Sequence, residues 1–421
     1  MRGEGRVGER ELRLIVKLVK EYYASPTCFI EEPSELPRRE VAFMFFERGE
    51  VLRHLVFSSL EELRKFLASQ APRHVYYSSA YYLSPGEKDM DSKGWLGADL
   101  VFDIDSDHLP TPCKEEHDSW RCLDCGAAGR GLAPQACPSC GGRRLESESF
   151  YLCPLCLEAA KSELLKLIED FLIPDFGFSS SELHIAFSGR RGYHLHVDSE
   201  AVRELDQYAR RELVDYLKAV SLRPEAHGFH ASIKGAIAPP ALSHPGWRGR
   251  VVRGIYSYLS SATVSDLEAL LPPSKRRLAA EIYESKDKLL AVLESSKPKW
   301  STLTKYGKRF WEGLVSKAIE LQRCEIDERV TTDVRRLIRL PGSLHGDTGL
   351  IAKPLSLREL DSFDPLKDSV AFREGEVKVR VGKCPRLTLM GECFGPFDGD
   401  AVTLPTAAAF YLLRSGLAEL A

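Results

Sequence analysis

Two aspartates stand two positions apart at the end of an apolar run, in the stretch "ADLVFDIDSD". Side chains alternate along a strand, which places Asp103 and Asp105 on one face and turns Phe102 and Ile104 toward a core on the other. Two carboxylates at this spacing repel each other unless cations neutralise them. Mg²⁺ and Mn²⁺ prefer oxygen ligands, and paired ions of this kind clamp the attacking and leaving oxygens in phosphoryl or nucleotidyl transfer.

The aspartate pair has other interpretations on its residues alone. Solvated strand ends often carry aspartates, and a strand that ends in DxD is also typical of haloacid-dehalogenase-type phosphatases, where the first acid is a nucleophile. Asp107 extends the run and is interpreted as a loop acid. A two-metal site usually needs a third acid. Asp327, in "CEIDERV", is a candidate, and by spacing alone Asp333 is equally good.

A glycine turn with two adjacent arginines lies in "SGRRGYHLHV", between two strand-like segments. Its glycines permit positive φ, and backbone N–H groups exposed in such a turn form an anion-binding nest. Arg190 and Arg191 add forked donors suited to phosphate oxygens, and Ser188 adds a hydroxyl. His194 is predicted to reach the same phosphate, whereas His196 is interpreted as a structural histidine. A tight turn with solvated arginines is the alternative.

A second basic turn lies in "RRLIRLPGSLHG". Pro341 and Gly342 predict the turn itself, with Arg339 before it and His345 after it. A triphosphate held against two metal ions requires about as much positive charge as the two turns carry together. The sequence therefore predicts one phosphate site built from both turns, with the aspartate strand between them.

Seven of the eleven cysteines fall between Cys113 and Cys156, and four of them form two CxxC pairs with eleven residues between the pairs. Each CxxC knuckle presents two thiolates to one tetrahedral zinc, so the pattern predicts structural zinc binding. The predicted ligands are Cys122, Cys125, Cys137 and Cys140 for one site, and Cys113, His117, Cys153 and Cys156 for a second. Spacing alone also permits Cys137 and Cys140 to pair with Cys153 and Cys156.

The composition excludes several classes of protein. The 421 residues carry a formal net charge of −3 and a hydrophobic fraction of 43%, which suits a chain of two or three domains with a sizeable core. No apolar run reaches the roughly 18 residues of a membrane span, and "MRGEGRVGER" lacks an apolar signal core, so secretion is not expected. Clustered CxxC pairs fit a reducing, cytoplasmic location. The charge balance argues against indiscriminate coating of nucleic acid, although a local basic groove is compatible with it.

Strands and helices must position these residues, and their periodicity is readable along the chain. Strand-rich material surrounds two insertions, one rich in cysteine and one helical. The predicted strands are 41–46, 52–57, 74–83 and 98–107, and the predicted helices are 9–23, 59–69, 157–172 and a short one at the C-terminal end, with a largely helical stretch of about 120 residues after Val197.

Several of these stretches, taken in order, resemble the small, catalytic subunit of archaeal and eukaryotic DNA primase, and the archaeal form more closely. They are "YYSSAYYL", "KGWLGADLVFDIDSDHL", "CPLCLEAAK", "SGRRGYHLHV" and "RLIRLPGSLHGDTGL". The resemblance implies an α/β (α+β) fold, with the archaeo-eukaryotic primase catalytic core, a zinc-binding insertion and a helical subdomain. The implied division is catalytic core in 1–107, 158–199 and 316–421, zinc-binding insertion in 108–157 and helical subdomain in 200–315.

The resemblance also assigns roles to residues. Asp103 and Asp105 match the metal-binding pair, and Asp327, eighteen residues before His345, matches the third acid in preference to Asp333. The zinc knuckle of the family favours the outer cysteine set, with the Cys122–Cys140 ribbon as an extra loop. The residues that match the two triphosphate-binding turns are Ser188, Arg190, Arg191, His194, Arg339 and His345.

One position departs from the family. Members often carry a lysine before "TGL", where this chain has Asp347. A charge that contacts phosphate is then missing, or Lys353 reaches in to supply it.

The activity that the resemblance implies is template-directed synthesis of short primers from nucleoside triphosphates, by two-metal nucleotidyl transfer with Mg²⁺ or Mn²⁺. The implied partners are a single-stranded DNA template and a primase large subunit in a heterodimer. The alternatives are a repair-type primase-polymerase without a large subunit and a non-catalytic, zinc-dependent nucleic-acid-binding protein. The candidate template contacts are Lys297, Lys299, Trp300, Lys305, Lys308 and Arg309.

Overall fold

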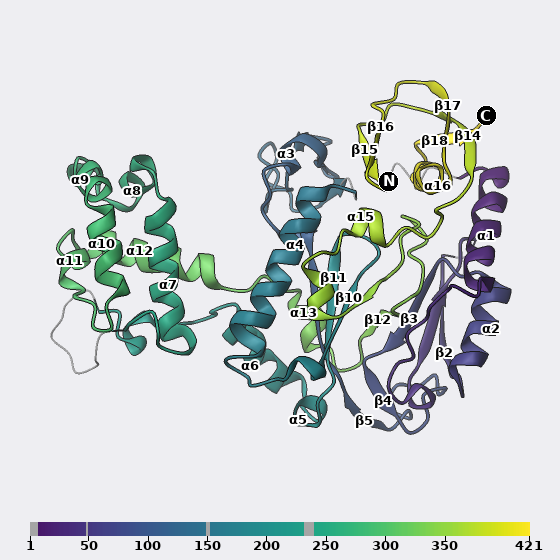
Figure 1. The fold of residues 1–421 in the computed structure, drawn as a ribbon, viewed down its shortest axis with the longest axis horizontal. Coiled ribbons are helices and arrows are strands. Elements are labelled where there is room, and N and C mark those ends of the chain that lie inside the picture. Colours follow the sequence, from purple (N-terminus) through teal and green to yellow (C-terminus); the bar gives the residue numbers. More distant parts are fainter. Residues whose placement is uncertain (1–6, 48, 149–151, 231–239) are drawn as a thin grey trace. The chain divides into compact units, whose positions relative to one another are not determined.

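The computed structural model describes residues 7–47, 49–148, 152–230 and 240–421 (Figure 1). Contacts divide the chain into two compact units. The first unit comprises Met1–Leu164, Ser179–Arg211 and Ile326–Ala421, and the second comprises Leu165–Phe178 and Glu212–Glu325. The expected mixture of helices and sheets is confirmed. The main part of the helical unit, Glu212–Glu325, begins and ends later than the predicted segment 200–315, and residues 165–178 belong to the same unit. The predicted domain borders stay a prediction.

The sheet that carries the aspartate pair has four strands in the order β13-β10-β11-β6, and all neighbours are antiparallel. The strands are β6 (Leu100–Asp105), β10 (Leu183–Phe187), β11 (Gly192–Val197) and β13 (Pro354–Leu355). Phe102 and Ile104 are buried, as the alternation predicts. The register places His194 opposite Asp103 and Gly192 opposite Asp105. The acids and the start of the arginine turn therefore meet at one end of this sheet.

A second four-stranded antiparallel sheet has the order β12-β3-β1-β2. Its strands are β1 (Val41–Met44), β2 (Val51–Leu55), β3 (His74–Ser78) and β12 (Leu337–Arg339), and α1 (Glu9–Ala24) packs against α2 (Leu60–Gln70) beside it. The helix predicted at 9–23 is confirmed. Leu12, Ile15, Val16 and Val19 lie on its apolar stripe, and Ile15 and Val19 are fully buried.

The strand predicted over 74–83 is interrupted. After β3 the chain passes into a separate two-stranded sheet made of β4 (Ala80–Tyr82) and β5 (Trp95–Ala98). The break has a physical cause in Arg39, which is buried and donates to the carbonyl oxygens of Ser78 and Ser79 at 2.8 and 3.1 Å. Those carbonyls are thereby satisfied outside a strand ladder.

The cysteine-rich insertion folds as a small three-stranded sheet in the order β8-β7-β9. Its elements are α3 (Lys114–His117), β7 (Ser119–Cys122), β8 (Ala128–Arg130) and β9 (Leu145–Glu148). The helix predicted at 157–172 begins earlier, as α4 (Pro154–Lys166), and 167–172 continue it with wider π-type turns. Shorter elements that follow in the first unit are α5 (Glu200–Arg203), α13 (Glu328–Thr332), α14 (Leu357–Leu360) and α15 (Pro365–Asp368), and α6 (Gln207–Leu217) begins in that unit.

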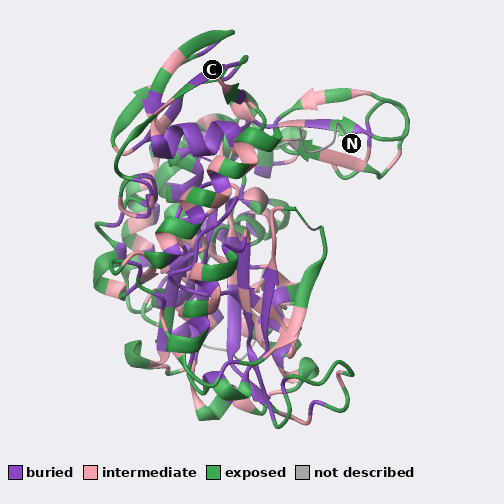
Figure 2. Cartoon of the chain, turned by 90° about the vertical axis from the view of Figure 1, so that its right-hand side faces the viewer, coloured by how far each residue is buried: buried purple, intermediate pink, exposed green. Residues whose placement is uncertain are grey.

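The C-terminal part of the first unit adds a sheet in the order β17-β14-β18 and a β15-β16 hairpin. The strands are β14 (Glu376–Val381), β15 (Leu387–Leu389), β16 (Glu392–Phe394), β17 (Asp400–Pro405) and β18 (Ala418–Leu420). The predicted C-terminal helix is confirmed as α16 (Thr406–Arg414), and the residues after it return as β18. Figure 2 shows buried positions gathered along the strands of the first unit and in α16, where Thr406 to Leu413 are all buried.

The second unit is helical. Its helices are α7 (Gly246–Ser261), α8 (Val264–Leu270), α9 (Leu278–Glu284), α10 (Lys286–Glu294), α11 (Ser301–Thr304) and α12 (Lys308–Gln322). Gly254 lets α7 approach α12 closely, because a Cβ at this position would lie 2.5 Å from the Ala318 carbonyl oxygen. Trp300 is 7% exposed and packs edge-on against Trp311, with ring centroids 5.2 Å apart. The interpretation of Trp300 as a template contact is therefore wrong: the indole belongs to the core of this unit.

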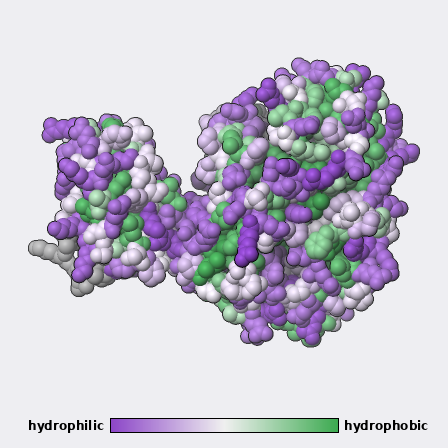
Figure 3. Space-filling model, in the orientation of Figure 1, coloured by the Kyte–Doolittle hydropathy of each residue, from purple (hydrophilic) through white to green (hydrophobic). Residues whose placement is uncertain are grey.

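Hydrophilic residues cover much of the face of each unit that Figure 3 shows, with hydrophobic patches between them. Across the described residues, no helix combines the length and the apolar character that crossing a bilayer requires.

Candidate active site

A hollow of about 170 Å³ brings most of the predicted site residues together in the first unit. We call it the central hollow. Acids from β6 and side chains from both basic turns line it, together with residues of β3 and β12. The lining residues are Tyr76, Asp103, Asp105, Ser188, Arg190, His194, Arg336, Leu337, Ile338, Arg339 and His345.

Two of the three predicted acids, Asp103 and Asp105, line this hollow, and Asp327 lies next to Asp103 but is not among the lining residues. The backbone N–H of Asp327 donates to the carbonyl oxygen of Asp103 at 3.0 Å, at the start of α13. Burial, followed by the negative charges of Asp105 and Asp327, raises the pKa of Asp103 to about 7. Asp333 is not among the principal charges that shift the pKa of Asp103. Asp327 is thus the third acid that the fold brings to the pair.

His194 lies directly beside the acids. Its Nε2 is 3.7 Å from Oδ1 of Asp103, as their cross-strand pairing requires. Burial, together with the charge of Arg339, lowers the pKa of His194 to about 3. The imidazole is therefore neutral at physiological pH and does not neutralise the acid cluster.

The first basic turn is closed by its own serine. Gly189 adopts a φ of 78°, and the Ser188 hydroxyl oxygen accepts from the N–H groups of Arg190 and Gly192 at 3.3 and 3.2 Å. These two N–H groups are therefore not open to an anion, and the predicted backbone nest is wrong for them. The turn offers side chains to the hollow instead.

The two arginines of this turn take different directions. Arg190 lines the central hollow. Arg191 is 5% exposed and forms an ion pair with Asp107, and its Nε lies 3.8 Å from Oδ1 of Asp105. Asp107, predicted to be a loop acid, is thus the carboxylate that holds Arg191 on the acid side of the site.

The two basic turns touch each other. A Cβ on Gly189 would lie 2.8 Å from Cβ of His345, so only glycine allows this approach. The Thr348 hydroxyl also donates to the Gly189 carbonyl oxygen at 2.6 Å. Helix α1 fixes the second turn from behind, because the Tyr22 hydroxyl donates to the Gly342 carbonyl oxygen at 2.8 Å. The sequence predicted both turns, and the fold makes them one surface.

Four residues of the hollow are not among the predicted site residues: Tyr76, Arg336, Leu337 and Ile338. The positive charge of Arg336 opposes the rise in the pKa of Asp103 that burial and the neighbouring acids cause, and it adds to the lowering of the pKa of His194 that burial causes. The signal for Arg336 in the sequence is the arginine doublet Arg335–Arg336, which lies directly before β12 begins at Leu337. Lys353, by contrast, lines a different hollow beside α1, so it does not supply the charge that Asp347 lacks.

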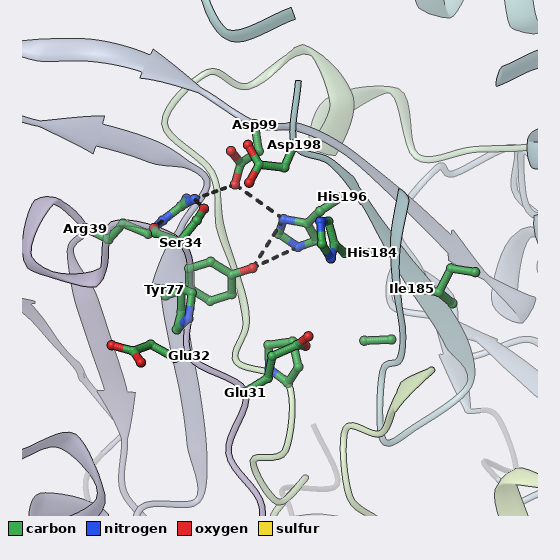
Figure 4. A pocket seen from close by; sticks show the side chains of 13 residues that line it. Glu31, Glu32, Ser34, Arg39, Tyr77, Asp99, His184, Ile185, His196 and Asp198 are labelled. Carbon is green, nitrogen blue, oxygen red and sulfur yellow. Dashed lines mark hydrogen bonds and ion pairs between the residues drawn. The ribbon is translucent and has the colours of Figure 1, made fainter. Parts of the chain in front are cut away.

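His196 is not among the residues that line the central hollow. It lines a second hollow with Tyr77, Asp99 and Arg39, shown in Figure 4. Its ring stacks on Tyr77 with centroids 5.5 Å apart, and its Nδ1 lies 3.8 Å from Oδ2 of Asp99. These contacts agree with a structural interpretation of His196.

The cysteines gather into two four-ligand groups, each with its ligand atoms within 4.8 Å of one another. The groups are Cys113, His117, Cys153 and Cys156, and Cys122, Cys125, Cys137 and Cys140. Thiolates around a tetrahedral zinc lie about 3.8 Å apart, and the structure has 3.7 Å for Cys122–Cys140 and for Cys125–Cys137. His117 Nδ1 lies 2.7 Å from the Asp118 carboxylate, which orients Nε2 toward the thiolates. Both groups have the donor set and spacing of a structural zinc site, and the alternative pairing is not formed.

Comparison with known proteins identifies the family. A family model described as DNA primase small subunit matches residues 146–357. The chain is 35% identical over 418 residues to the DNA primase small subunit PriS of Methanothrix thermoacetophila, covering 95% of this chain and 96% of that protein. It is 35% identical to PriS of Pyrobaculum aerophilum (90% and 91% covered) and 32% identical to PriS of Cenarchaeum symbiosum (98% and 100% covered). The chain therefore belongs to the DNA primase small subunit family, that of primer-synthesising nucleotidyltransferases.

Proposed function

We propose that the central hollow binds a nucleoside triphosphate against two divalent cations and joins it to the 3′-hydroxyl of a growing primer. The observation that carries this proposal is that two acids and side chains of both basic turns line one hollow, with a third acid, Asp327, next to Asp103. Asp103, Asp105 and Asp327 would hold Mg²⁺ or Mn²⁺. Such ions, when bound, activate the attacking hydroxyl and neutralise charge on the α-phosphate. The raised pKa of Asp103 supports the assignment, because a carboxylate that is buried and lies beside two other acids is stabilised in its charged form by a bound cation.

The basic turns are proposed to hold the β- and γ-phosphates. Arg190 and Arg339 supply fixed guanidinium donors from opposite turns, and Ser188 and His345 lie beside them. Neutral His194 offers one N–H, between the acids and the phosphates. Arg191 contributes from the acid side, where it pairs with Asp107. Catalysis is then mostly positioning and electrostatic stabilisation of the departing pyrophosphate.

We further propose a large subunit and a single-stranded DNA template as partners. The relatives are named small subunits, which implies a larger companion chain. Family membership removes the alternative of a non-catalytic zinc-dependent binding protein and disfavours a polymerase that acts alone. Copurification of a second chain in stoichiometric amount tests the heterodimer.

Both cysteine groups are proposed to hold Zn²⁺, one ion each. Metal analysis of the purified chain should give two zinc ions. Cys113→Ser and Cys125→Ser, which affect different groups, should each lower the content to one. Two separate sites would be contradicted if the parent held one zinc ion and either substitution removed it.

The experiment that tests the proposed reaction compares Asp327→Asn with Asp333→Asn in primer synthesis on a single-stranded template. Both variants remove one negative charge from the same short segment. Only Asp327 lies beside Asp103, so its variant should lose synthesis by at least about a thousandfold, whereas Asp333→Asn should stay within a few-fold of the parent. Equal activities of the two variants would overturn the assignment.

A further inference from the structure

The turn that follows His345 carries an acid held by three basic side chains. Oδ1 of Asp347 lies 2.8 Å from a guanidinium nitrogen of Arg73 and 3.0 Å from one of Arg414. Its Oδ2 lies 3.3 Å from Nε2 of His74. Although burial acts in the opposite direction, the hydrogen bond with His74 and the surrounding positive charges hold the pKa of Asp347 far below its usual value. The carboxylate is therefore ionised and can only accept hydrogen bonds.

His74 connects this acid to the central hollow. Its second nitrogen, Nδ1, lies 3.1 Å from a terminal nitrogen of Arg339, and Arg339 lines the hollow. His74 and Asp347 are not among the lining residues. The chain of contacts thus runs from Asp347 through the imidazole to a residue that faces the triphosphate site.

We propose that Asp347 and His74 are positioning residues that fix the guanidinium of Arg339 for binding the triphosphate. The inference rests on the proposed role of Arg339 and deepens it, because it names the residues that set the direction of this side chain.

The donors and acceptors of Asp347, His74 and Arg339 allow only one position for the proton on the His74 ring. Asp347 accepts only, so Nε2 of His74 carries the proton that points to it. Burial lowers the pKa of His74 to about 4, so the ring is neutral at physiological pH and has a single N–H. Nδ1 is then a bare acceptor. A guanidinium only donates, so Arg339 meets the nitrogen that can accept from it.

Arg339 has a second constraint. Its guanidinium carbon lies 5.2 Å from the ring centroid of Tyr76, the residue opposite it in the β3–β12 pair. The arginine is 9% exposed, and fixing a planar fork inside such a site favours phosphate contacts that form without further reorganisation.

A metal ion at this place is the competing interpretation. One ligand atom from each of His74, His345 and Asp347 lies within 4.8 Å of the others. Two arginines already form ion pairs with the Asp347 carboxylate, and a third donates to the His74 imidazole. This surplus of positive charge opposes a cation, so we assign the group to positioning.

Asp347→Asn tests the chain of contacts from Asp347 through His74 to Arg339, which we call the relay. The substitution leaves the shape of the side chain unchanged. The two arginines retain the amide oxygen, so the amide NH₂ turns to Nε2 of His74. That nitrogen must then accept, the proton moves to Nδ1, and two donors face each other at Arg339. The expected result is an increase of about tenfold in KM for nucleoside triphosphate in primer synthesis, with kcat changed little.

Arg414→Gln is the matched control, because it removes one partner of the same carboxylate and leaves the imidazole tautomer unchanged. Its KM should equal that of the parent, and thermal melting reports the folding of every variant. A KM increase in Arg414→Gln as large as that in Asp347→Asn would overturn the relay, since it would reveal a merely structural cluster.

His74 gives an independent rescue test. Glutamine can donate to Asp347 through its amide nitrogen and accept from Arg339 through its oxygen, whereas leucine can do neither. His74→Gln should therefore keep a KM near that of the parent, and His74→Leu should raise it about tenfold. Equal KM values for the two variants would contradict the relay.

Arg339→Ala distinguishes the phosphate role of Arg339 from the positioning roles of Asp347 and His74. An unchanged KM in this variant refutes the phosphate role of Arg339 itself. A raised KM in Arg339→Ala together with a parental KM in Asp347→Asn refutes the relay alone.

Discussion

Asp99 and Asp103 lie four residues apart, one just before β6 and one within it, yet their charges have opposite surroundings. Oδ2 of Asp99 accepts from Arg39 at 2.8 Å and Oδ1 accepts from the Tyr81 hydroxyl at 2.6 Å. Burial alone would raise its pKa, but His196 and Arg39 hold it at about 2. Burial and two neighbouring acids instead raise the pKa of Asp103 to about 7.

The carboxylate of Asp99 is paired within the protein and stabilises the fold, whereas the carboxylate of Asp103 lies beside other acids and is suited to binding a cation. Arg39 joins the loop at Ser34, the break at Ser78 and Ser79, and Asp99, so the second hollow in Figure 4 is held together by pairs within the chain. The acid cluster of the central hollow has surplus negative charge. A buried acid whose partners belong to its own chain stabilises the fold, whereas acids that face one another gain most from a cation.

The largest effect is expected for Asp105→Asn. Loss of one acid should reduce primer synthesis at least about a thousandfold, because several kcal/mol of charge stabilisation are lost and each 1.4 kcal/mol or so is tenfold in rate. The same change relieves repulsion, so the thermal midpoint without divalent cations should equal or exceed that of the parent. Synthesis near the parental rate would contradict the role of the acid.

Asp99→Asn should show the reverse pattern. Removing the charge leaves buried Arg39 without its carboxylate and should cost about 3 kcal/mol of unfolding free energy at pH 7. The folded pKa of Asp99 lies below its unfolded value near 4, so the stabilisation is present above pH 4 and is lost as the pH falls toward 2.

Urea unfolding at pH 7 and pH 3 measures this change, and the difference between parent and variant should shrink at the lower pH. The kcat of the folded variant should stay near the parental value. A variant as stable as the parent but inactive would place Asp99 in the active site and remove the contrast with Asp103.

A smaller contrast is expected within the first basic turn. Arg190→Ala should raise KM for nucleoside triphosphate by roughly 10- to 100-fold, the value of one charge-assisted hydrogen bond. Arg191→Ala should act mainly through the acids beside it, with a higher affinity for Mn²⁺ because a neighbouring positive charge is lost, and with a smaller change in KM. Steady-state kinetics at several Mn²⁺ concentrations distinguishes the two. Identical profiles would show that both arginines face the phosphates.

Local patterns predicted the elements well where their spacing is regular. The DxD strand, the helix at 9–23 and the two CxxC knuckles followed from side-chain period or ligand spacing. The break at Ser79 was not predictable, because it depends on a guanidinium forty residues earlier in the chain. Trp300 was misassigned for a similar reason: a tryptophan among lysines resembles a nucleic-acid contact until its packing on Trp311 is known.

The same limit applies to the site. Residue types identified the acids and both turns, but not that Arg190 and Arg191 diverge or that Gly189 brings the turns into contact. The sequence shows only that Asp347 replaces a lysine common in the family, whereas the structure shows that Arg73, Arg414 and His74 surround its carboxylate. Such relations depend on tertiary contacts between distant segments.

Binding of Mn²⁺, followed by electron paramagnetic resonance in the parent, in Asp103→Asn and in Asp99→Asn, tests the central claim most directly. The parent and Asp99→Asn should bind Mn²⁺ with similar affinity, and Asp103→Asn should bind it at least about tenfold more weakly, because only Asp103 belongs to the surplus of negative charge. Unchanged affinity in Asp103→Asn, or an equal loss in Asp99→Asn, would contradict the assignment of the metal site to the acids of the central hollow.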